Sequence, residues 1–519
     1  MKGAARTAES RRVAGLTAAA VCCVYVTTAG GSLNSIDAVM TFEVTRSLVT
    51  ASTTAFNVAG LNHHPGVDGR YYSPFGIGQS IFNVPFYLVG RAASQHLHVG
   101  KPDTIEKAAV AFGSAVAAAG AVWIACLFAW HLSGHLPASC GTALALGFGT
   151  LVWPYSKMGF NAALTTWCLL GGLYSAWLGV RTDRPALLAW AGVWLACALL
   201  TRHEMALAAP LVIGWTAWES RHDRGVLTRR IAAIGIPFAA GAACWLWYND
   251  TRFGSPFETG NLGPAFFHAQ NFRFDRSILT GILGLLFSPG RSLFIYVPLA
   301  AAGALALPEL ARRDRSTTVL VGSVLVSFLL VYSSLEYWDG LRGYGPRYLV
   351  PLLPLLILPL VWWLGGDGRR PRPLLSIVIV ISVLAQLPGV LVDFSKVSVV
   401  HARRSGGYSR DAKIYSWRQS GLTLNALDAI DALPVNVRNL AHGIRPAAVV
   451  QPPESDEDRE FSQRFAFSLD FWWLYLFYLG AIPAWAAVVL GAMPLLIAWA
   501  LIRRAFDIAR AGRPALPSA

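Results

Sequence analysis

Long apolar runs separated by short polar connections dominate the chain. A helix needs about 20 mostly apolar residues to cross the roughly 30 Å hydrocarbon core of a bilayer. The pattern therefore predicts an all-α polytopic membrane protein, a bundle of about twelve transmembrane helices. The predicted spans cover residues 13–31, 108–130, 138–154, 161–180, 185–201, 204–218, 231–249, 291–307, 317–334, 348–365, 373–391 and 471–501.

The first apolar run follows a basic stretch that contains Lys2, Arg6, Arg11 and Arg12. Basic residues before an apolar run are also the pattern of a cleaved signal peptide. The run Val13–Gly30 is long for such a peptide, and many more spans follow it. These features favour an uncleaved first helix with its N-terminus in the cytoplasm.

Arginine clusters in the short connections predict the orientation of the spans. They lie at 181–184, 219–230, 308–316 and 366–373, and again in the tail from Arg503. Basic residues favour the cytoplasmic side, and all these connections share one side if Ile77–Ser94 does not span. That segment is apolar but contains Pro85 and Arg91, so we predict a helix lying along the outer interface.

The orientation predicts how the chain is divided between membrane and water. A transmembrane catalytic core at 1–391 would carry outer loops at 32–107, 250–290 and 334–348. An extracytoplasmic loop region follows at 392–470, and 471–519 forms the last transmembrane segment with a cytoplasmic tail. The spans and their orientation predict a multi-pass protein of the plasma membrane.

Composition supports a membrane protein over a nucleic-acid-binding protein. Hydrophobic residues make up 54% and charged residues 14% of the chain, whereas soluble chains carry about a quarter charged residues. The formal net charge of +14 comes from short basic clusters between apolar runs. We therefore expect the basic residues to contact membrane lipids, and we expect the protein to bind no nucleic acid.

The first outer loop offers a candidate catalytic acid or base. Asp37 follows the first span within a few residues, so it lies near the membrane surface. A carboxylate there can take a proton from an attacking hydroxyl or hold a divalent cation. The alternative is structural, with Ser35 or Asp37 capping a helix over Val39–Val49.

The same loop continues into the runs Asp-Gly-Arg-Tyr-Tyr-Ser (68–73) and Gly-Ile-Gly-Gln (76–79). Asp68-Gly69 is typical of a turn. His63 and His64 are possible metal ligands, but adjacent histidines lack the spacing of ligands on one helix face, so a solvated turn is favoured.

Basic residues at the ends of several spans are candidates for binding a phosphate. Arg347 follows a Gly-Pro turn and precedes an apolar run, in a segment that also holds Glu336 and Tyr344. An arginine at such a boundary either snorkels to lipid phosphate or holds a ligand phosphate by paired hydrogen bonds. Lys157, Arg202 and Arg291 occupy similar positions. For Arg202, a local pair with Glu204 is equally consistent with the sequence.

Taken together, these motifs resemble those of the polyprenyl-phosphate-dependent glycosyltransferases of the GT-C superfamily. The resemblance is to the bacterial protein-mannosyltransferase-like and aminoarabinose-transferase-like branch. It rests on Asp37, on the runs at 68–79, and on two further pairs of motifs. One pair is Phe-Gly-Ser-Pro (253–256) with Leu-Phe-Ser-Pro-Gly-Arg (286–291), and the other is Tyr-Trp-Asp-Gly (337–340) with Gly-Pro-Arg-Tyr (345–348).

The resemblance implies transfer of a sugar from a polyprenyl-phosphate donor to a lipid, polysaccharide or protein acceptor at the periplasmic face. Asp37 would be the catalytic acidic residue, and Arg202 would lie near the donor phosphate. Relatives carry two adjacent acidic residues at this place, whereas Ala38 follows Asp37 here. Glu43 or Asp68 is therefore a candidate for the second role, and a divalent cation held by Asp37 stays an open alternative.

Two other functions are compatible with the sequence. A transporter or flippase for lipid-linked saccharides would show paired halves and spans broken near the midplane, which we do not find. An O-antigen ligase would also act on lipid-linked sugars outside the cell, but it does not need an acidic residue directly after the first span.

Overall fold

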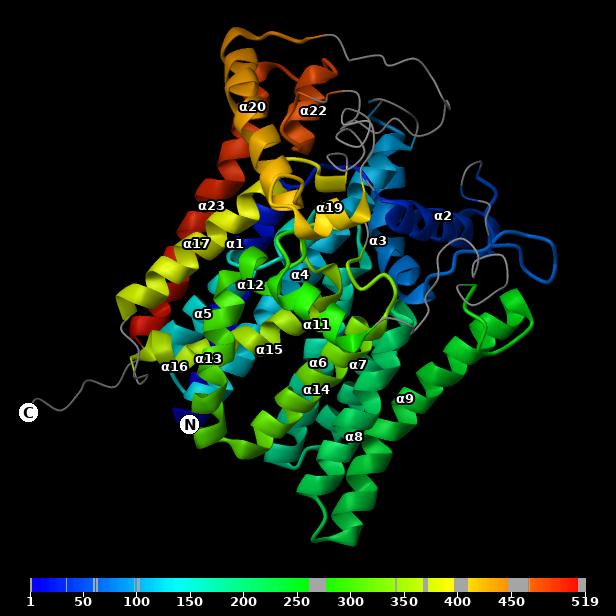
Figure 1. Cartoon of the computed structure of the whole chain (residues 1–519), viewed down its shortest axis with the longest axis vertical. Coiled ribbons are helices and arrows are strands. Elements are labelled where there is room, and N and C mark those ends of the chain that lie inside the picture. The colour runs from blue at the N-terminus through cyan, green and yellow to red at the C-terminus, as the bar shows by residue number, and fades with distance from the viewer. Residues whose placement is uncertain are drawn as a thin grey trace, which may run out of the picture.

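The computed structural model describes residues 2–33, 35–58, 61, 64–97, 99, 103–260, 277–340, 343–366, 372–395, 409–446, 465 and 467–511. Within these residues the chain forms 20 α-helices. Extended pairing among them is limited to isolated β-bridges of Tyr71 with Phe56 and with Pro65. The predicted all-α class is confirmed (Figure 1).

The helices follow one another in a single order along the chain. The first half comprises α1 (Lys2–Thr27), α2 (Ile36–Ala51), α3 (Ile77–Ser94), α4 (Thr104–Ser133), α5 (Leu136–Phe148), η1 (Pro154–Ser156), α6 (Asn161–Thr182), α7 (Pro185–Thr201), η2 (His203–Leu207), α8 (Ala208–Glu219) and α9 (Arg224–Phe253). The second half comprises α11 (Ile278–Phe287), α12 (Leu293–Tyr296), α13 (Pro298–Arg313), α14 (Arg315–Ser334), η3 (Arg347–Leu352), α15 (Leu353–Ile357), α16 (Leu360–Gly365), α17 (Arg372–Leu391), α19 (Arg410–Tyr415), α20 (Gly421–His442), α22 (Trp472–Tyr478) and α23 (Ala484–Ala511).

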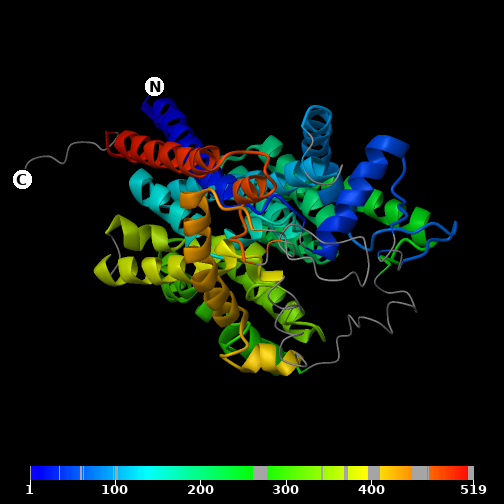
Figure 2. The same cartoon turned by 90° about the horizontal axis from the view of Figure 1, so that it is seen from above.

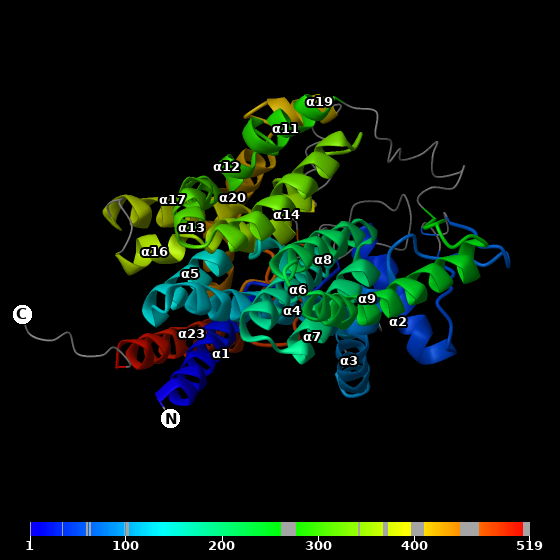
Figure 3. The same ribbon diagram turned by 90° about the horizontal axis from the view of Figure 1, so that it is seen from below.

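Six of the described helices are long and apolar enough to cross a membrane: α4, α6, α9, α14, α17 and α23. The most apolar stretches of α4 and α6 are 78% and 83% buried, and both helices lie at the centre of the bundle (Figure 3). Those of α9 and α23 are only 11% and 17% buried. Outer helices with exposed apolar side chains need an apolar surrounding. The protein is therefore a multi-pass membrane protein.

The first and last long helices, α1 and α23, pack side by side (Figure 2). The short helix α22, just before α23, is fastened to the end of α1. The indole N–H of Trp472 donates to the carbonyl of Val26 at 2.9 Å, and that of Trp473 donates to the carbonyl of Thr27 at 3.0 Å. These bonds satisfy carbonyls that the end of α1 leaves without helical partners.

Arginine-rich connections gather at one end of the bundle, which we call the Arg-rich end. Arg181, in the last turn of α6, pairs with Asp314, between α13 and α14, at 2.7 Å. Arg229 and Arg230 of α9 pair with Asp183 at 2.8 and 2.9 Å and hold the pKa of that carboxyl below its usual value. This grouping agrees with the common side that the sequence predicted for these connections.

The opposite end, which we call the polar end, contains the ends of α1 and α7 and the beginnings of α4 and η3. Helix α3 has both of its ends there. A Cβ on Gly76, before α3, would lie 2.1 Å from the carbonyl oxygen of Leu200 in α7. One on Gly90 would lie 2.8 Å from Cα of Glu106 in α4. The segment 77–94 is thus a helix that starts and finishes at one end of the bundle, which keeps the Arg-rich connections together.

Several predicted spans are interrupted, and these are corrections to the sequence-based boundaries. The segment 471–501 breaks at Gly480, which has φ +79° and separates α22 from α23. The segment 348–365 divides into η3, α15 and α16. Its prolines at 351, 354 and 359 lack the N–H that a continuous helix needs.

Candidate active site

Asp37 lies in the first turn of α2, at the polar end. Ser35, not Asp37, is the N-cap, because its hydroxyl accepts the N–H of Ala38 at 3.1 Å. The Asp37 carboxylate is therefore not used as the cap, and the positive end of the helix dipole favours its negative charge. Its Oδ2 lies 3.5 Å from Nη1 of Arg347. Two residues from opposite halves of the chain thus meet at the polar end.

Arg347 begins η3, directly after Pro346. Its guanidinium lies over the rings of Tyr348 and Phe160, at 5.2 and 5.9 Å from their centroids. The 3.5 Å separation from Asp37 exceeds the 2.7–2.9 Å that is typical of a charge-assisted hydrogen bond. The side chain of Arg347 keeps 19% of its surface exposed and that of Asp37 keeps 30%. The pair is loose and open to a ligand.

Glycines in the preceding segment make room for the stem of Arg347. Gly340 has φ +70°, and a Cβ there would lie 2.8 Å from Cγ of Arg347. Gly340→Ala combines this overlap with about 1–2 kcal/mol of left-handed backbone strain. We expect it to weaken donor binding and lower the thermal midpoint of the purified protein, as measured by ligand titration and by thermal unfolding in detergent. Gly69→Ala is the control, because Gly69 also has a positive φ but no atom within 4 Å. Equal effects of both changes on donor binding would contradict the role given to Gly340.

Arg202 lies beside this pair, between α7 and η2. It forms an ion pair with Glu204, and its guanidinium lies 5.4 Å from the centroid of Tyr348 and 5.9 Å from that of Tyr332. The Tyr332 and Tyr348 rings are stacked, with centroids 5.2 Å apart. The guanidinium groups of Arg202 and Arg347 therefore both lie against the Tyr348 ring. Such cation–π contacts stabilise positive charge at a partly dehydrated site.

The site therefore combines two arginines and two carboxylates at the polar end. Asp37 and Glu204 each keep 30% of their side-chain surface exposed, whereas Arg202 keeps 8%. An incoming phosphate can compete with the two carboxylates for the guanidinium groups by forming paired hydrogen bonds. The sequence indicated Asp37, Arg202 and Arg347, and the structure brings these three together. The sequence did not single out Tyr332 or Phe160, because aromatic residues at span ends are common in membrane proteins.

Arg291 and Tyr344 lie behind the segment that carries Arg347. Nη1 of Arg291 donates to the carbonyl of Gly343, and the Tyr344 hydroxyl donates to the carbonyl of Ala385 at 2.6 Å. The carbonyl of Tyr344 in turn accepts the hydroxyl of Tyr155 at 3.1 Å. These contacts fix the backbone before Arg347 from its inner side.

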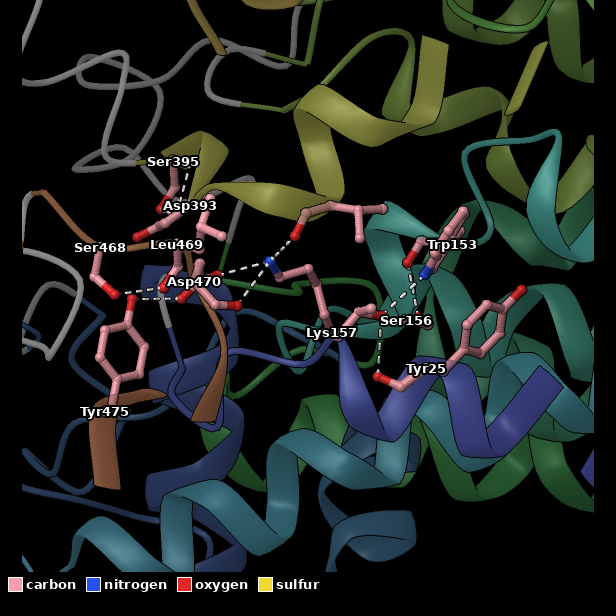
Figure 4. Close-up of polar contacts among 12 residues, drawn as sticks. Tyr25, Trp153, Ser156, Lys157, Asp393, Ser395, Ser468, Leu469, Asp470 and Tyr475 are labelled. Carbon is pink, nitrogen blue, oxygen red and sulfur yellow. Dashed lines mark hydrogen bonds and ion pairs between the residues drawn. The ribbon is translucent and has the colours of Figure 1, made fainter. Parts of the chain in front are cut away.

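Lys157 is buried elsewhere in the polar end, 1% exposed, in an ion pair with Asp470 (Figure 4). Its Nζ lies 2.8 Å from Oδ2 of Asp470 and donates to the carbonyl of Val390 at 2.6 Å. The Tyr475 hydroxyl donates to Oδ1 of Asp470 at 2.9 Å. The pair joins the core to the segment that leads into α22.

Breaking this pair should reduce stability. Lys157→Met leaves a buried carboxylate without its cation, which typically costs about 3–5 kcal/mol. We expect a lower thermal midpoint in detergent, and partial recovery in the double variant Lys157→Met with Asp470→Leu. A single variant that keeps the normal midpoint but loses donor binding would instead place Lys157 in the substrate site.

The remaining acidic candidates have other surroundings. Glu43 is buried further along α2 and forms an ion pair with Arg46. Asp68 accepts the N–H of Arg70 at 3.0 Å and the Tyr72 hydroxyl at 2.8 Å, and these bonds lower the pKa of the exposed Asp68 carboxyl. A carboxylate with a lowered pKa is a weaker base. Glu336 has a buried Oε2 with no hydrogen-bond partner among the described residues, and its carbonyl accepts a hydrogen bond from Arg410.

No group of three or more His, Cys, Asp or Glu side chains that could hold a metal ion occurs within the described residues. Asp37 faces a guanidinium, which does not fit the oxygen ligands that a divalent cation prefers. His63 lies outside the described residues, and His64 is buried with Nδ1 3.0 Å from the carbonyl oxygen of Gly260.

Comparison of the sequence with models of known protein families and with curated proteins finds no match. Solved structures do share the fold. The crystal structure of ArnT from Cupriavidus metallidurans bound to undecaprenyl phosphate is similar with a TM-score of 0.51 and 13% identity, over 96% of this chain and 77% of that chain. Its apo structure gives a TM-score of 0.50 and 12% identity, over 95% and 77%. An oligosaccharyltransferase from Archaeoglobus fulgidus gives 0.48 and 12%, over 91% and 63%.

The class that the fold defines is therefore an all-helical membrane protein built like ArnT over almost the whole chain. This is the fold of the GT-C glycosyltransferases, as the motifs predicted.

Proposed function

We propose that the protein is a membrane glycosyltransferase that moves a sugar from a polyprenyl-phosphate donor to a hydroxyl of a lipid, polysaccharide or protein acceptor. The observation that carries this proposal is the meeting of Asp37 and Arg347, with Arg202 on the shared Tyr348 ring. This arrangement lies within a fold shared with ArnT, whose crystal structure contains undecaprenyl phosphate.

In the proposed reaction the arginines bind the donor phosphate and the carboxylate serves the acceptor. The acceptor hydroxyl attacks the anomeric carbon, and its proton passes to Asp37. The bond between the anomeric carbon and the phosphate oxygen breaks, and polyprenyl phosphate leaves. Arg347 and Arg202 stabilise the negative charge that develops on the leaving oxygen, which is where fixed cations lower a barrier most.

We further propose that the polar end faces the periplasm of a bacterial inner membrane and that the N-terminus is cytoplasmic. The support is the gathering of the Arg-rich connections at the other end, because such clusters favour the cytoplasm. Single cysteines at two exposed positions test this. We expect a membrane-impermeant maleimide to label Arg70→Cys in intact spheroplasts, and His222→Cys only after lysis. The reverse pattern would exclude the orientation.

The activity is tested with purified protein in liposomes and short-chain polyprenyl-phosphate sugars carrying a labelled sugar. A transferase releases polyprenyl phosphate and attaches the label to an acceptor. A flippase would move the intact donor across the bilayer without breaking the sugar–phosphate bond, and that result would overturn the proposal. An O-antigen ligase would also transfer a lipid-linked glycan, but it would not need Asp37.

A further inference from the structure

Helix α20 buries several amides and exposes large aliphatic side chains. The side chains that point into the protein include three asparagines, Asn425, Asn436 and Asn439, each no more than 5% exposed. Four large aliphatic side chains on the opposite side are exposed. They are Leu427 at 52%, Ile430 at 66%, Leu433 at 49% and Val437 at 59%. We call these four residues the α20 apolar stripe.

The spacing of the residues places the two sets on opposite faces. At 100° per residue, Ile430, Leu433 and Val437 fall on one side of the helix and Asn425, Asn436 and Asn439 on the other. A helix exposed to water normally turns its apolar side chains inward and its amides outward. In α20 three amides face inward beside Leu424, Ala429 and Ala432, and the large aliphatic side chains face outward. The outer face therefore fits an apolar surrounding better than water.

Hydrogen bonds hold the amide of Asn436 on the inner face of α20. The Asn436 amide nitrogen donates to the carbonyls of Ala432 at 2.7 Å and Phe467 at 3.0 Å. Its oxygen accepts the hydroxyl of Tyr478 at 2.8 Å and that of Ser468 at 3.1 Å. Asn436 thus ties the inner face of α20 to Tyr478 of α22 and to the segment before it, and α20 cannot turn its stripe inward without breaking these bonds.

We propose that the α20 apolar stripe contacts the acyl chains of the membrane lipid. Helix α20 packs against both α17 and α23 (Figure 1). Those two helices are long enough to span the membrane and expose apolar side chains of the same kind, such as Leu384 at 56% and Leu496 at 66%. The stripe therefore extends a lipid-facing surface, and this continuity favours lipid over a second copy of the chain.

The proposal changes the assignment of the region 392–470. Part of that region, predicted from its position to lie in water, would rest in the leaflet on the side of the polar end. The beginning of α20 is also tied to the active-site segment, because the N–H of Leu422 donates to the Tyr296 hydroxyl at 2.9 Å. The Tyr296 ring contacts Tyr344 at a centroid distance of 4.9 Å. Lipid contact along α20 thus fixes the depth of the site relative to the membrane. The lipid contact itself does not depend on the proposed activity.

Spin labelling in liposomes tests the proposal. The full chain carries Cys197→Ala and Cys244→Ala to remove its exposed cysteines, and then one new cysteine with a nitroxide. Ile430→Cys and Val437→Cys probe the stripe, Leu496→Cys on α23 is the lipid control, and His222→Cys is the water control. Each site is measured for collisions with oxygen, which concentrates in lipid, and with a water-soluble nickel complex.

We expect the ratio of oxygen to nickel accessibility at 430 and 437 to shift from the value at 222 to that at 496. A ratio equal to that at 222 would show that the stripe faces water and would overturn the proposal. Low accessibility to both reagents with dipolar broadening of the spectrum would show contact with a second copy, and it would overturn the proposal as well.

Discussion

Replacing Asp37 by Asn should lower the rate of sugar transfer by about 10²–10⁴, the usual contribution of a positioned general base. The amide keeps the shape of the carboxyl group but cannot take the acceptor proton. Because Ser35 caps α2, the change removes no cap and the protein should still fold and insert. The measurement is the turnover of a labelled polyprenyl-phosphate sugar by purified protein, with thermal unfolding as the check on folding.

Asp68→Asn is the matched control for this prediction. Asp68 is an exposed carboxylate in the same loop region, with hydrogen bonds inside its own turn. We expect it to keep near-normal turnover. If Asp37→Asn were fully active and Asp68→Asn inactive, the base would be Asp68 and the proposed site would have to move.

Arg347→Gln should lower kcat/KM by about 10²–10³, the effect of removing one fixed group that stabilises developing negative charge. Arg347→Lys should recover only part of the loss, because an ammonium lacks the planar pair of donors that matches a phosphate. Product inhibition by polyprenyl phosphate should weaken in parallel, since the same guanidinium binds the released phosphate. Inhibition constants and kcat/KM are measured on the same preparations.

Arg70→Gln serves as the control, because Arg70 has a 65% exposed side chain at the same end of the molecule. Loss of transfer with unchanged product inhibition in Arg347→Gln would show that Arg347 does not contact the phosphate. A loss of the same size in Arg70→Gln would point to a general charge effect.

The fold class could be predicted from the sequence because apolar run length is a direct consequence of bilayer thickness. Asp37, Arg202 and Arg347 could also be singled out, since charged residues at span ends are costly to place. That they converge could not be derived, because the distance between the ends of two spans depends on how the helices pack. Lys157 illustrates the limit: in the sequence it resembles Arg202, but in the structure its cation is neutralised by Asp470.

The breaks within predicted spans coincide with prolines and a glycine, which a prediction based on the length of apolar runs does not take into account. The prolines at 351, 354 and 359 and the glycine at 480 mark the interruptions. Helix α20 had no such signal, since a 22-residue helix with both asparagines and aliphatic residues fits a surface helix in water equally well. Only the structure shows which of its faces points inward.

The opposition of Asp37 and Arg347 has a consequence for the order of events. The Asp37 carboxylate and the Arg347 guanidinium face each other, with 3.5 Å between Oδ2 and Nη1, and an anion that binds Arg347 takes this partner away from the carboxylate. In the proposed reaction, the donor phosphate therefore frees the carboxylate that serves the acceptor hydroxyl. The proposed reaction therefore predicts ordered binding, in which the donor phosphate reaches Arg347 before the acceptor hydroxyl can use Asp37.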